Sequence, residues 1–255
     1  AASRLGGEDT DYPAGATLTT AGAANGDALP DVIVGAPGDT KKQVGRAYLL
    51  AGSEELFDNS LSGASTRITA SNRVLFGTAV SGGDLDGDGL SDLVASSPLE
   101  EDGFSYRAGT AHVFLGDELS YGMSVLEDDA ILEGESGGDR LGTALDATGD
   151  LNGDGYADLV AGAPEDDNGD VNGGGVMVVF GEPSFSGTLT FDARLLGGQY
   201  RARAGSSVAV VEDIDGNNRD ELLVGAPGAS VGSASSGLAY FCLLYTSPSP
   251  RDGTK

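Results

Sequence analysis

The sequence predicts an all-β fold, a β-propeller built from four-stranded antiparallel blades. Three observations support this fold: a long repeat, one acidic loop at the same place in each repeat, and short apolar runs bounded by Gly, Pro, Asn and Asp. The first position of the loop falls at Ala23, Asp84, Asp150 and Asp213, which are 61, 66 and 63 residues apart. A β-sandwich is the main alternative, but it would not repeat one loop at a regular period.

Each repeat is expected to contain the same strands in the same order. A first strand of small residues, suited to the crowded axis of a propeller, opens at 14–15, 76–77, 141–142 and 204–205. A second, apolar strand begins at the last acid of the loop, over 31–34, 92–95, 158–161 and 221–224. A Pro three residues further on ends it, because Pro cannot donate to a ladder. Third strands are predicted over 45–50, 109–115, 175–180 and 237–241, and weaker fourth strands near 67–70, 130–133 and 194–196.

Three of these elements together resemble a known repeat. Phe76-Gly77, the acidic loop and Gly162-Ala163-Pro164 are similar to FG-GAP repeats, which form the blades of the N-terminal propeller of integrin α-subunits. The resemblance covers roughly residues 14–243. It implies a ring that usually closes with seven blades, and this chain holds about four, so we expect a fragment of a larger propeller.

The repeat suggests where one blade gives way to the next. We expect a propeller domain over 1–243, with blades roughly at 14–72, 73–136, 137–198 and 200–243, the last lacking its fourth strand. Residues 244–255 contain several Pro and Ser residues and do not follow the pattern of the repeat. We interpret them as a non-native or linker tail.

The acidic loop has the residue types of a calcium site. Its nine positions place oxygen-bearing side chains at 1, 3, 5 and 9 and a backbone carbonyl at 7, and calcium takes six to eight oxygen ligands. About three sites are predicted, and the FG-GAP resemblance implies the same ligands. They are Asp84, Asp86, Asp88, Leu90 and Asp92; Asp150, Asn152, Asp154, Tyr156 and Asp158; and Asp213, Asp215, Asn217, Arg219 and Glu221.

Position 6 of the loop has to turn with a positive φ. Gly89 and Gly155 permit this, and Asn218 is among the residues that tolerate it. The first repeat departs from the pattern because Ala23 replaces the first ligand. It retains Asn25, Asp27 and Asp31, a weak site or none.

Other metal sites fit the loop less well. An EF-hand needs a bidentate Glu at position 12, where this chain has Ala95, Ala161 and Val224. Magnesium demands a stricter octahedral geometry, and zinc prefers nitrogen and sulfur ligands, of which the chain has one His and one Cys. A solvated Asp/Gly turn is the remaining alternative, and three such turns with matched spacing argue against it.

Composition excludes several classes of partner. The 255 residues carry a formal net charge of −26, which opposes binding to nucleic acid because phosphates require a basic face. No apolar run approaches the length of a membrane span. A single Cys excludes an internal disulfide. The acidic surface keeps the protein soluble and attracts cations.

No catalytic constellation is recognisable in the sequence. His112 alternates with apolar residues in a predicted strand, which favours a packing role between blades over that of a general base. Cys242 is expected to be a small apolar side chain rather than a nucleophile. Neither a Gly-x-Ser-x-Gly elbow, a P-loop nor a dinucleotide fingerprint occurs, so we expect no enzyme activity in this chain.

A second set of acids lies in the loops that join second and third strands. In integrins that face of the propeller binds ligand, so the resemblance implies a ligand face here, with a solvated loop as the simpler interpretation. The acids are Glu100, Glu101, Asp102, Glu165, Asp166, Asp167 and Asp170.

Two functions fit these observations. The first is a calcium-binding propeller of a secreted or cell-surface protein that acts in adhesion, with an extracellular protein or glycan as ligand. The second is a non-catalytic accessory domain of a larger extracellular enzyme, a hydrolase or lyase. Fold alone does not decide between them.

Overall fold

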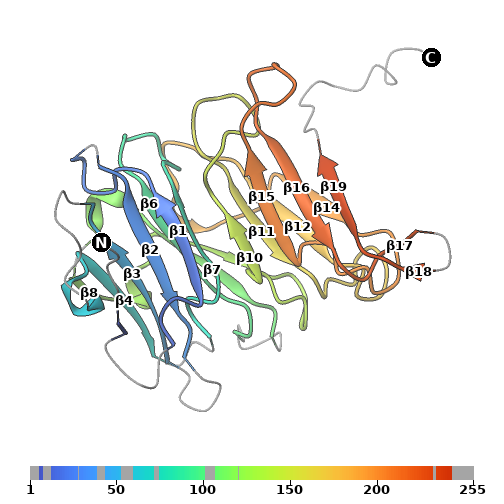
Figure 1. Ribbon diagram of the computed structural model, residues 1–255, viewed down its shortest axis with the longest axis horizontal. Helices are drawn as coiled ribbons and strands as arrows, with labels where there is room; N and C mark the ends of the chain where they lie inside the picture. The colour runs from blue at the N-terminus through green and yellow to red at the C-terminus, as the bar shows by residue number, and fades with distance from the viewer. Residues whose placement is uncertain are drawn as a thin grey trace.

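The computed structural model describes residues 6–7, 13–27, 29–38, 44–52, 60–71, 75–100, 107–119, 121–231 and 234–242. Within these ranges the chain forms four successive sheets whose sequential strands are antiparallel, which confirms the all-β propeller architecture (Figure 1). Its helices there are single 3-10 turns, too short and too polar to cross a membrane: η1 (Leu61–Gly63), η2 (Gly116–Glu118) and η3 (Val125–Glu127).

The sheets repeat one strand order. Sheet 1 contains β1 (Thr17–Ala21), β2 (Asp31–Ala36), β3 (Val44–Leu50) and β4 (Thr66–Ser71). Sheet 2 contains β5 (Val80–Gly83), β6 (Asp92–Ser97), β7 (Thr110–Phe114) and β9 (Ala130–Glu133). Sheet 3 contains β10 (Ala144–Asp146), β11 (Leu159–Ala163), β12 (Gly175–Val179) and β14 (Ala193–Leu196). Sheet 4 contains β15 (Ser207–Val211), β16 (Glu221–Ala226) and β19 (Leu238–Cys242), and β17 (Ser230–Val231) pairs with β18 (Ala234–Ser235) beside it.

Most of the hydrophobic core lies between successive sheets, and a further cluster, which includes Tyr48 and Leu61, joins sheet 1 to η1. One cluster joins sheets 1 and 2 and includes Ile33 and Phe114; the next joins sheets 2 and 3 and includes Leu132 and Leu159. A third, containing Leu222, joins sheets 3 and 4. Full burial of such a side chain contributes about 1.5–3 kcal/mol, so each sheet is stabilised mainly by its neighbours.

Two further strands tie neighbouring sheets together. β8 (Tyr121–Ser124) lies between β7 and β9 in the chain but pairs in parallel with β4, the outer strand of sheet 1. β13 (Gly187–Thr188), between β12 and β14, pairs in the same way with β9 of sheet 2. Sheets 1 and 2 therefore each receive a parallel edge strand from the next sheet along the chain, a feature that the sequence did not predict.

The loops that join first and second strands lie at one end of the sheets, along the upper edge in Figure 1. We call them acid loops 1 to 4, over residues 23–31, 84–92, 150–158 and 213–221. Position 9 is the first residue of the second strand in sheets 1, 2 and 4, so the ladder itself fixes where this acid stands. The loops joining second and third strands lie at the opposite end.

Candidate metal sites in the acid loops

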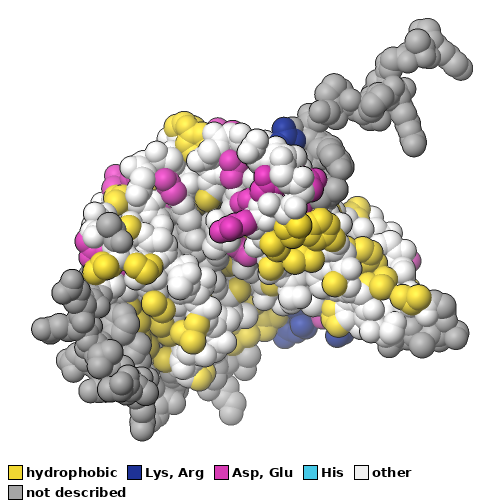
Figure 2. All heavy atoms as spheres, turned by 45° about the horizontal axis from the view of Figure 1, so that its top comes forward, with side chains coloured by type: hydrophobic (Ala, Val, Ile, Leu, Met, Phe, Trp, Pro, Cys, Tyr) yellow, Lys and Arg dark blue, Asp and Glu magenta, His cyan; other side chains and the backbone are white. Residues whose placement is uncertain are grey.

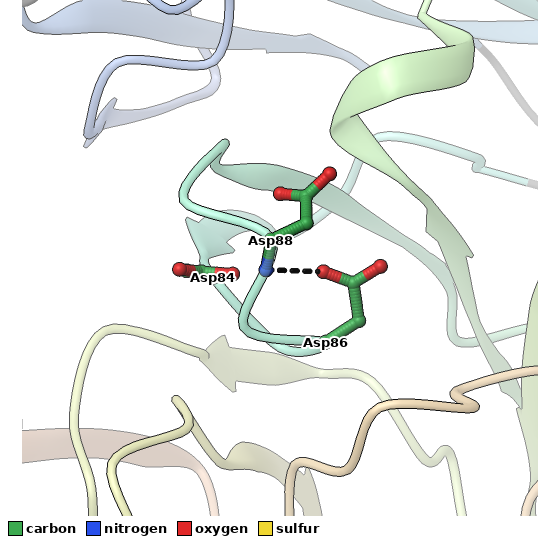
Figure 3. A group of neighbouring side chains, drawn as sticks. All are labelled: Asp84, Asp86 and Asp88. Atoms are coloured by element: carbon green, nitrogen blue, oxygen red, sulfur yellow. Dashed lines mark hydrogen bonds between the residues drawn. The ribbon is translucent and has the colours of Figure 1, made fainter.

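Acid loop 2 brings three carboxylates together. One oxygen from each of Asp84, Asp86 and Asp88 lies within 4.8 Å of the others. The backbone N–H of Asp88 donates to Asp86 Oδ1 at 3.1 Å (Figure 3), and that of Gly89 donates to Asp84 Oδ2 at 3.0 Å. These backbone bonds hold the side chains in place, so the cluster is built by the loop itself.

Asp84 also provides an observation that fits a cation. Its Oδ1 atom is buried and has no hydrogen-bond partner. A buried carboxylate oxygen without a donor costs on the order of 1–3 kcal/mol, and a cation would offset that cost. Oxygen donors of this kind suit a hard cation such as calcium.

Acid loop 4 forms a second cluster with a different membership. Oxygens of Asp213, Asp215 and Glu221 lie within 4.8 Å of one another, and Glu221 Oε1 is buried without a hydrogen-bond partner. The N–H of Asn218 donates to Asp213 Oδ2 at 2.8 Å and is the main cause that lowers the pKa of Asp213. The longer Glu at position 9 thus reaches the side chains at positions 1 and 3.

Acid loop 3 is arranged differently, because its third position is Asn. Asn152 Nδ2 donates to Asp154 Oδ2 at 2.8 Å, and both oxygens of Asp150 accept backbone N–H groups of the loop. Among the described residues, no three carboxylates of this loop converge within 4.8 Å. A metal here would require the Asn152 amide to turn its oxygen inward, which would break the hydrogen bond that Oδ1 accepts from the Asp154 N–H at 2.8 Å.

Acid loop 1 shares the amide contact of loop 3. Asn25 Nδ2 donates to Asp27 Oδ2 at 3.0 Å, and Ala23 offers no carboxylate at position 1. The three predicted oxygen donors of this loop do not form a carboxylate cluster among the described residues. Acid loop 1 therefore offers a cation fewer convergent carboxylate oxygens than acid loops 2 and 4.

The position-9 acid has a structural role that sequence reasoning missed. In each loop its carboxylate is at most 1% exposed and accepts the N–H of position 2, at 2.7–2.9 Å. In the first three sheets its other oxygen accepts the N–H of a Gly that follows the third strand, at 2.6–3.0 Å. The acids are Asp31, Asp92, Asp158 and Glu221. In those three sheets they tie the loop, the second strand and the end of the third strand together.

Burial leaves two of these acids with perturbed protonation. Desolvation by burial raises the pKa of Asp92 and of Asp158 to about 7, and the backbone hydrogen bonds only partly offset this. A neighbouring cation would favour the charged forms. Both remain predicted ligands, since each carboxylate oxygen has two lone pairs.

The turn geometry of the loops is as predicted. Gly89 and Gly155 at position 6 have φ of 88° and 96°, and Asn218 has φ of 61°. The peptide carbonyls of Leu90, Tyr156 and Arg219 are predicted ligands from position 7. The N–H groups of Leu90 and Tyr156 donate to the position-5 carboxylates Asp88 and Asp154. Figure 2 turns this edge of the molecule forward and shows acidic side chains clustered on it.

The acids at the opposite end are not all surface groups. Glu100 and Asp166 are 3% and 0% exposed. Arg194 forms ion pairs with Asp166 and Glu135, while His112 lies 3.3 Å from Glu100 and 2.7 Å from Asp128. Burial of an acid is tolerated when a cation or a hydrogen-bond donor pairs with it. Arg194 pairs with Asp166, and the Thr110 hydroxyl donates to Glu100 at 2.7 Å, so these two carboxylates serve the interior of the sheets.

The remaining acids of that end are distributed as follows. Asp167 and Asp170 are exposed, and Glu165 is half-buried beside Arg140 at 3.2 Å. Glu101 and Asp102 lie outside the described residues, as do residues 243–255. His112, expected to be a packing residue, is buried as predicted, but its carboxylate partners were not foreseen. The sequence does contain a signal for the two buried acids. In the second and third repeats an acid, Glu100 or Asp166, stands two residues after the Pro that ends the second strand.

Comparison with known proteins identifies the repeat. The FG-GAP repeat model matches residues 76–114, 141–179 and 204–242. Integrin alpha-PS5 of Drosophila melanogaster is 38% identical over 161 residues, or 60% of this chain and 15% of the relative. Integrin alpha-4 of Xenopus laevis is 31% identical over 204 residues, 77% of this chain and 18% of the relative.

A relative of another kind also matches. Phosphatidylinositol-glycan-specific phospholipase D of Mus musculus is 29% identical over 212 residues, which are 80% of this chain and 24% of the relative. The chain thus spans less than a quarter of the length of these relatives. Each of the three matched repeats contains one acid loop and the strands on either side of it, and similarity to integrin α-subunits extends over most of the chain. The chain therefore belongs to the FG-GAP repeat family of integrin α-like β-propellers.

Proposed function

We propose that this chain is a calcium-binding propeller segment of a secreted or cell-surface protein, and that it serves adhesion or ligand binding. The observation that carries the calcium assignment is the oxygen cluster of acid loop 2, in which the buried Asp84 Oδ1 has no hydrogen-bond donor. Similarity to integrin α-subunits supports the adhesive role.

Calcium would be held by the odd positions of acid loops 2, 3 and 4. The ion would supply positive charge rather than a reaction step. In acid loop 2 it would offset part of the repulsion among four carboxylates within nine residues. If each site has a Kd on the order of 10⁻⁴ M and free calcium is about 1 mM, each adds roughly 1.4 kcal/mol to the free energy of unfolding.

The test is thermal unfolding with and without calcium. We expect a chelator to lower the melting temperature, calcium at about 1 mM to restore it, and magnesium at the same concentration to restore it less, given its stricter geometry. The combination of Asp84→Asn with Asp88→Asn should reduce the calcium effect without abolishing folding. A melting temperature that is unaffected by the chelator would refute a stabilising calcium site.

The second candidate is an accessory domain of a larger extracellular enzyme. Similarity to the phospholipase D over 80% of the chain favours it. The coding sequence on either side of this segment separates the candidates, because an adjoining catalytic domain supports the enzyme and adhesion modules or a membrane anchor support the adhesion protein. Calcium binding is expected in both cases.

A further inference from the structure

Neighbouring acid loops contact one another in a repeating way. The backbone N–H at position 8 of one loop donates to the position-1 carbonyl of the loop before it. Ala157 N donates to the oxygen of Asp84, and Asp220 N to that of Asp150, both at 2.9 Å. The bonded carbonyls belong to the two residues whose carboxylates open acid loops 2 and 3.

A second contact repeats beside the first. Each position-4 Gly meets the position-7 side chain of the next loop. A Cβ added to Gly87 would lie 2.3 Å from Tyr156 Cε1, and one added to Gly153 would lie 3.1 Å from Arg219 Cγ. A Cβ added to Gly216 in acid loop 4 would meet no atom within 4 Å, since no further loop follows it among the described residues.

Asp220 strengthens the link between acid loops 3 and 4. Its Oδ2 atom accepts the N–H of Asp150 at 2.8 Å, and its Oδ1 atom accepts that of Asp213 at 3.1 Å. One carboxylate therefore holds the position-1 residues of two successive loops. The loops form a connected row along one edge, in which the position of each depends on the next.

We propose that calcium binds acid loops 2, 3 and 4 with positive cooperativity, transmitted through these contacts. This proposal rests on the calcium assignment above. The loop shape that brings the carboxylates of loop 2 together is also the shape that presents Asp84 and Gly87 to acid loop 3. An ion that favours this shape in one loop therefore favours the contacts and, with them, the corresponding shape in its neighbour.

Charge acts in the opposite direction, because two bound cations repel one another. At an ionic strength of 0.15 M the screening length is about 8 Å, so repulsion between ions in separate exposed loops is strongly reduced, whereas direct contacts are not screened. Contact coupling should dominate at this salt concentration. Cooperativity should decrease when the salt concentration is lowered.

Calorimetric titration with calcium measures the coupling directly. Acid loop 4 is disabled throughout by Asp213→Asn with Asp215→Asn. Three proteins are compared: one with loops 2 and 3 intact, one with loop 2 also disabled by Asp84→Asn with Asp88→Asn, and one with loop 3 also disabled by Asp150→Asn with Asp154→Asn. Circular dichroism confirms that each is folded before titration.

We expect the product of the two association constants in the two-loop protein to exceed the product of the single-loop constants by at least about fivefold, the lower end of usual allosteric coupling. Tyr156→Ala should reduce this factor, because it removes the side chain that meets Gly87 of acid loop 2. A two-loop isotherm equal to the sum of the single-loop isotherms overturns the proposal.

A matched pair of glycine variants tests the contact itself. In the protein with only acid loop 3 intact, Gly87→Ala should weaken calcium binding by pressing on Tyr156. Gly216→Ala, with a similar φ of 80° against 76°, should leave it unchanged. Equal effects of the two substitutions would contradict the proposed route. No calcium binding by any intact loop would instead overturn the calcium assignment, so the two failures are distinguishable.

Discussion

At the scale of single residues, the position-9 acid combines two roles that can be separated experimentally. Asp31 stands in acid loop 1, which lacks the first ligand, yet it makes the same two backbone hydrogen bonds as Asp92 and Asp158. Because acid loop 1 has few ligands, the presence of Asp31 there indicates that the hydrogen-bonding role of this acid does not depend on a bound ion. In acid loop 4 the corresponding Glu221 also contributes an oxygen to the cluster with Asp213 and Asp215.

Replacement of Asp31 should therefore destabilise the protein with or without calcium. Asp31→Ala leaves the N–H groups of Ala24 and Gly52 without their acceptor, and we expect a loss of about 2–4 kcal/mol in the free energy of unfolding. Urea denaturation in calcium and in chelator measures it. Asp84→Ala is the comparison and should destabilise the protein more in calcium than in chelator. An Asp31→Ala effect confined to calcium would show that this acid is a ligand instead.

Asp139 gives a pH prediction away from the acid loops. Burial raises its pKa from 3.8 to about 6, while the N–H of Ser136 donates to it at 2.9 Å. Between these two pH values the folded state binds more protons than the unfolded state, so the free energy of unfolding falls as the pH rises from about 4 to 6. The loss is complete above pH 6 and amounts to at most about 3 kcal/mol.

Asp139→Asn removes this titration and keeps an acceptor for Ser136. The variant should be more stable than the unmodified protein at pH 7, and the difference should vanish near pH 4. Urea denaturation at constant calcium from pH 4 to 8 provides the measurement. Asp117→Asn, at an exposed acid, serves as the control for the loss of one formal negative charge. A constant difference across the pH range would contradict the assignment.

At the scale of strands and loops, the close approach of neighbouring sheets explains why glycine precedes three of the four acid loops. The residue before each acid loop is Gly22, Gly83, Gly149 or Glu212. A Cβ on Gly83 would lie 1.7 Å from the carbonyl oxygen of Ala147, whereas Glu212 is exposed on the last sheet. Glycine is present where another sheet follows and is replaced where none does among the described residues.

Gly83→Ala should therefore disturb the junction of sheets 2 and 3. The obstacle is backbone, which cannot turn aside as a side chain can, so we expect a loss of about 2 kcal/mol or more in the free energy of unfolding. Gly198→Ala is the matched control, because a Cβ there meets no atom within 4 Å. Chemical denaturation of both variants measures the difference, and similar stabilities would contradict the close approach.

The sequence predicted the second, third and fourth strands of the repeat well, placed the first strands three or four residues too early, and did not predict the edge strands. Position 31 and its equivalents mark second strands because an acid, an apolar run and a Pro follow one another there. β8 and β13 have no such local signal, since their pairing with β4 and β9 is decided by the proximity of another sheet. Side-chain partners distant in sequence, such as Arg194 for Asp166, depend on the same long-range proximity.

At the scale of the whole molecule, spacing predicted which residues form the acid loops but not how their side chains converge. Asp and Asn at position 3 fit one ligand pattern equally in sequence. In the structure the amide of Asn152 donates to Asp154, whereas Asp86 contributes an oxygen to a cluster. Hydrogen-bond direction distinguishes these loops, and a spacing pattern does not contain it.

The excess of acids makes the stability of the whole chain sensitive to salt. A formal net charge of −26 opposes compaction, and the acid loops concentrate part of that charge along one edge. In chelator, raising NaCl from about 0.02 to 0.5 M should raise the melting temperature, because the screening length falls from about 20 Å to about 4 Å. With saturating calcium the same increase in salt should have a smaller effect, since bound ions already offset loop charge.

Differential scanning calorimetry at both salt concentrations, with and without calcium, tests this expectation. KCl in place of NaCl is the control: equal effects indicate screening, and unequal effects indicate that a particular monovalent ion binds. A melting temperature that falls with salt in chelator would show that repulsion among the acids does not govern the salt dependence. We expect this dependence because the carboxylates that would bind calcium also repel one another within one compact fold. Bound calcium and added salt would therefore both reduce the same electrostatic repulsion.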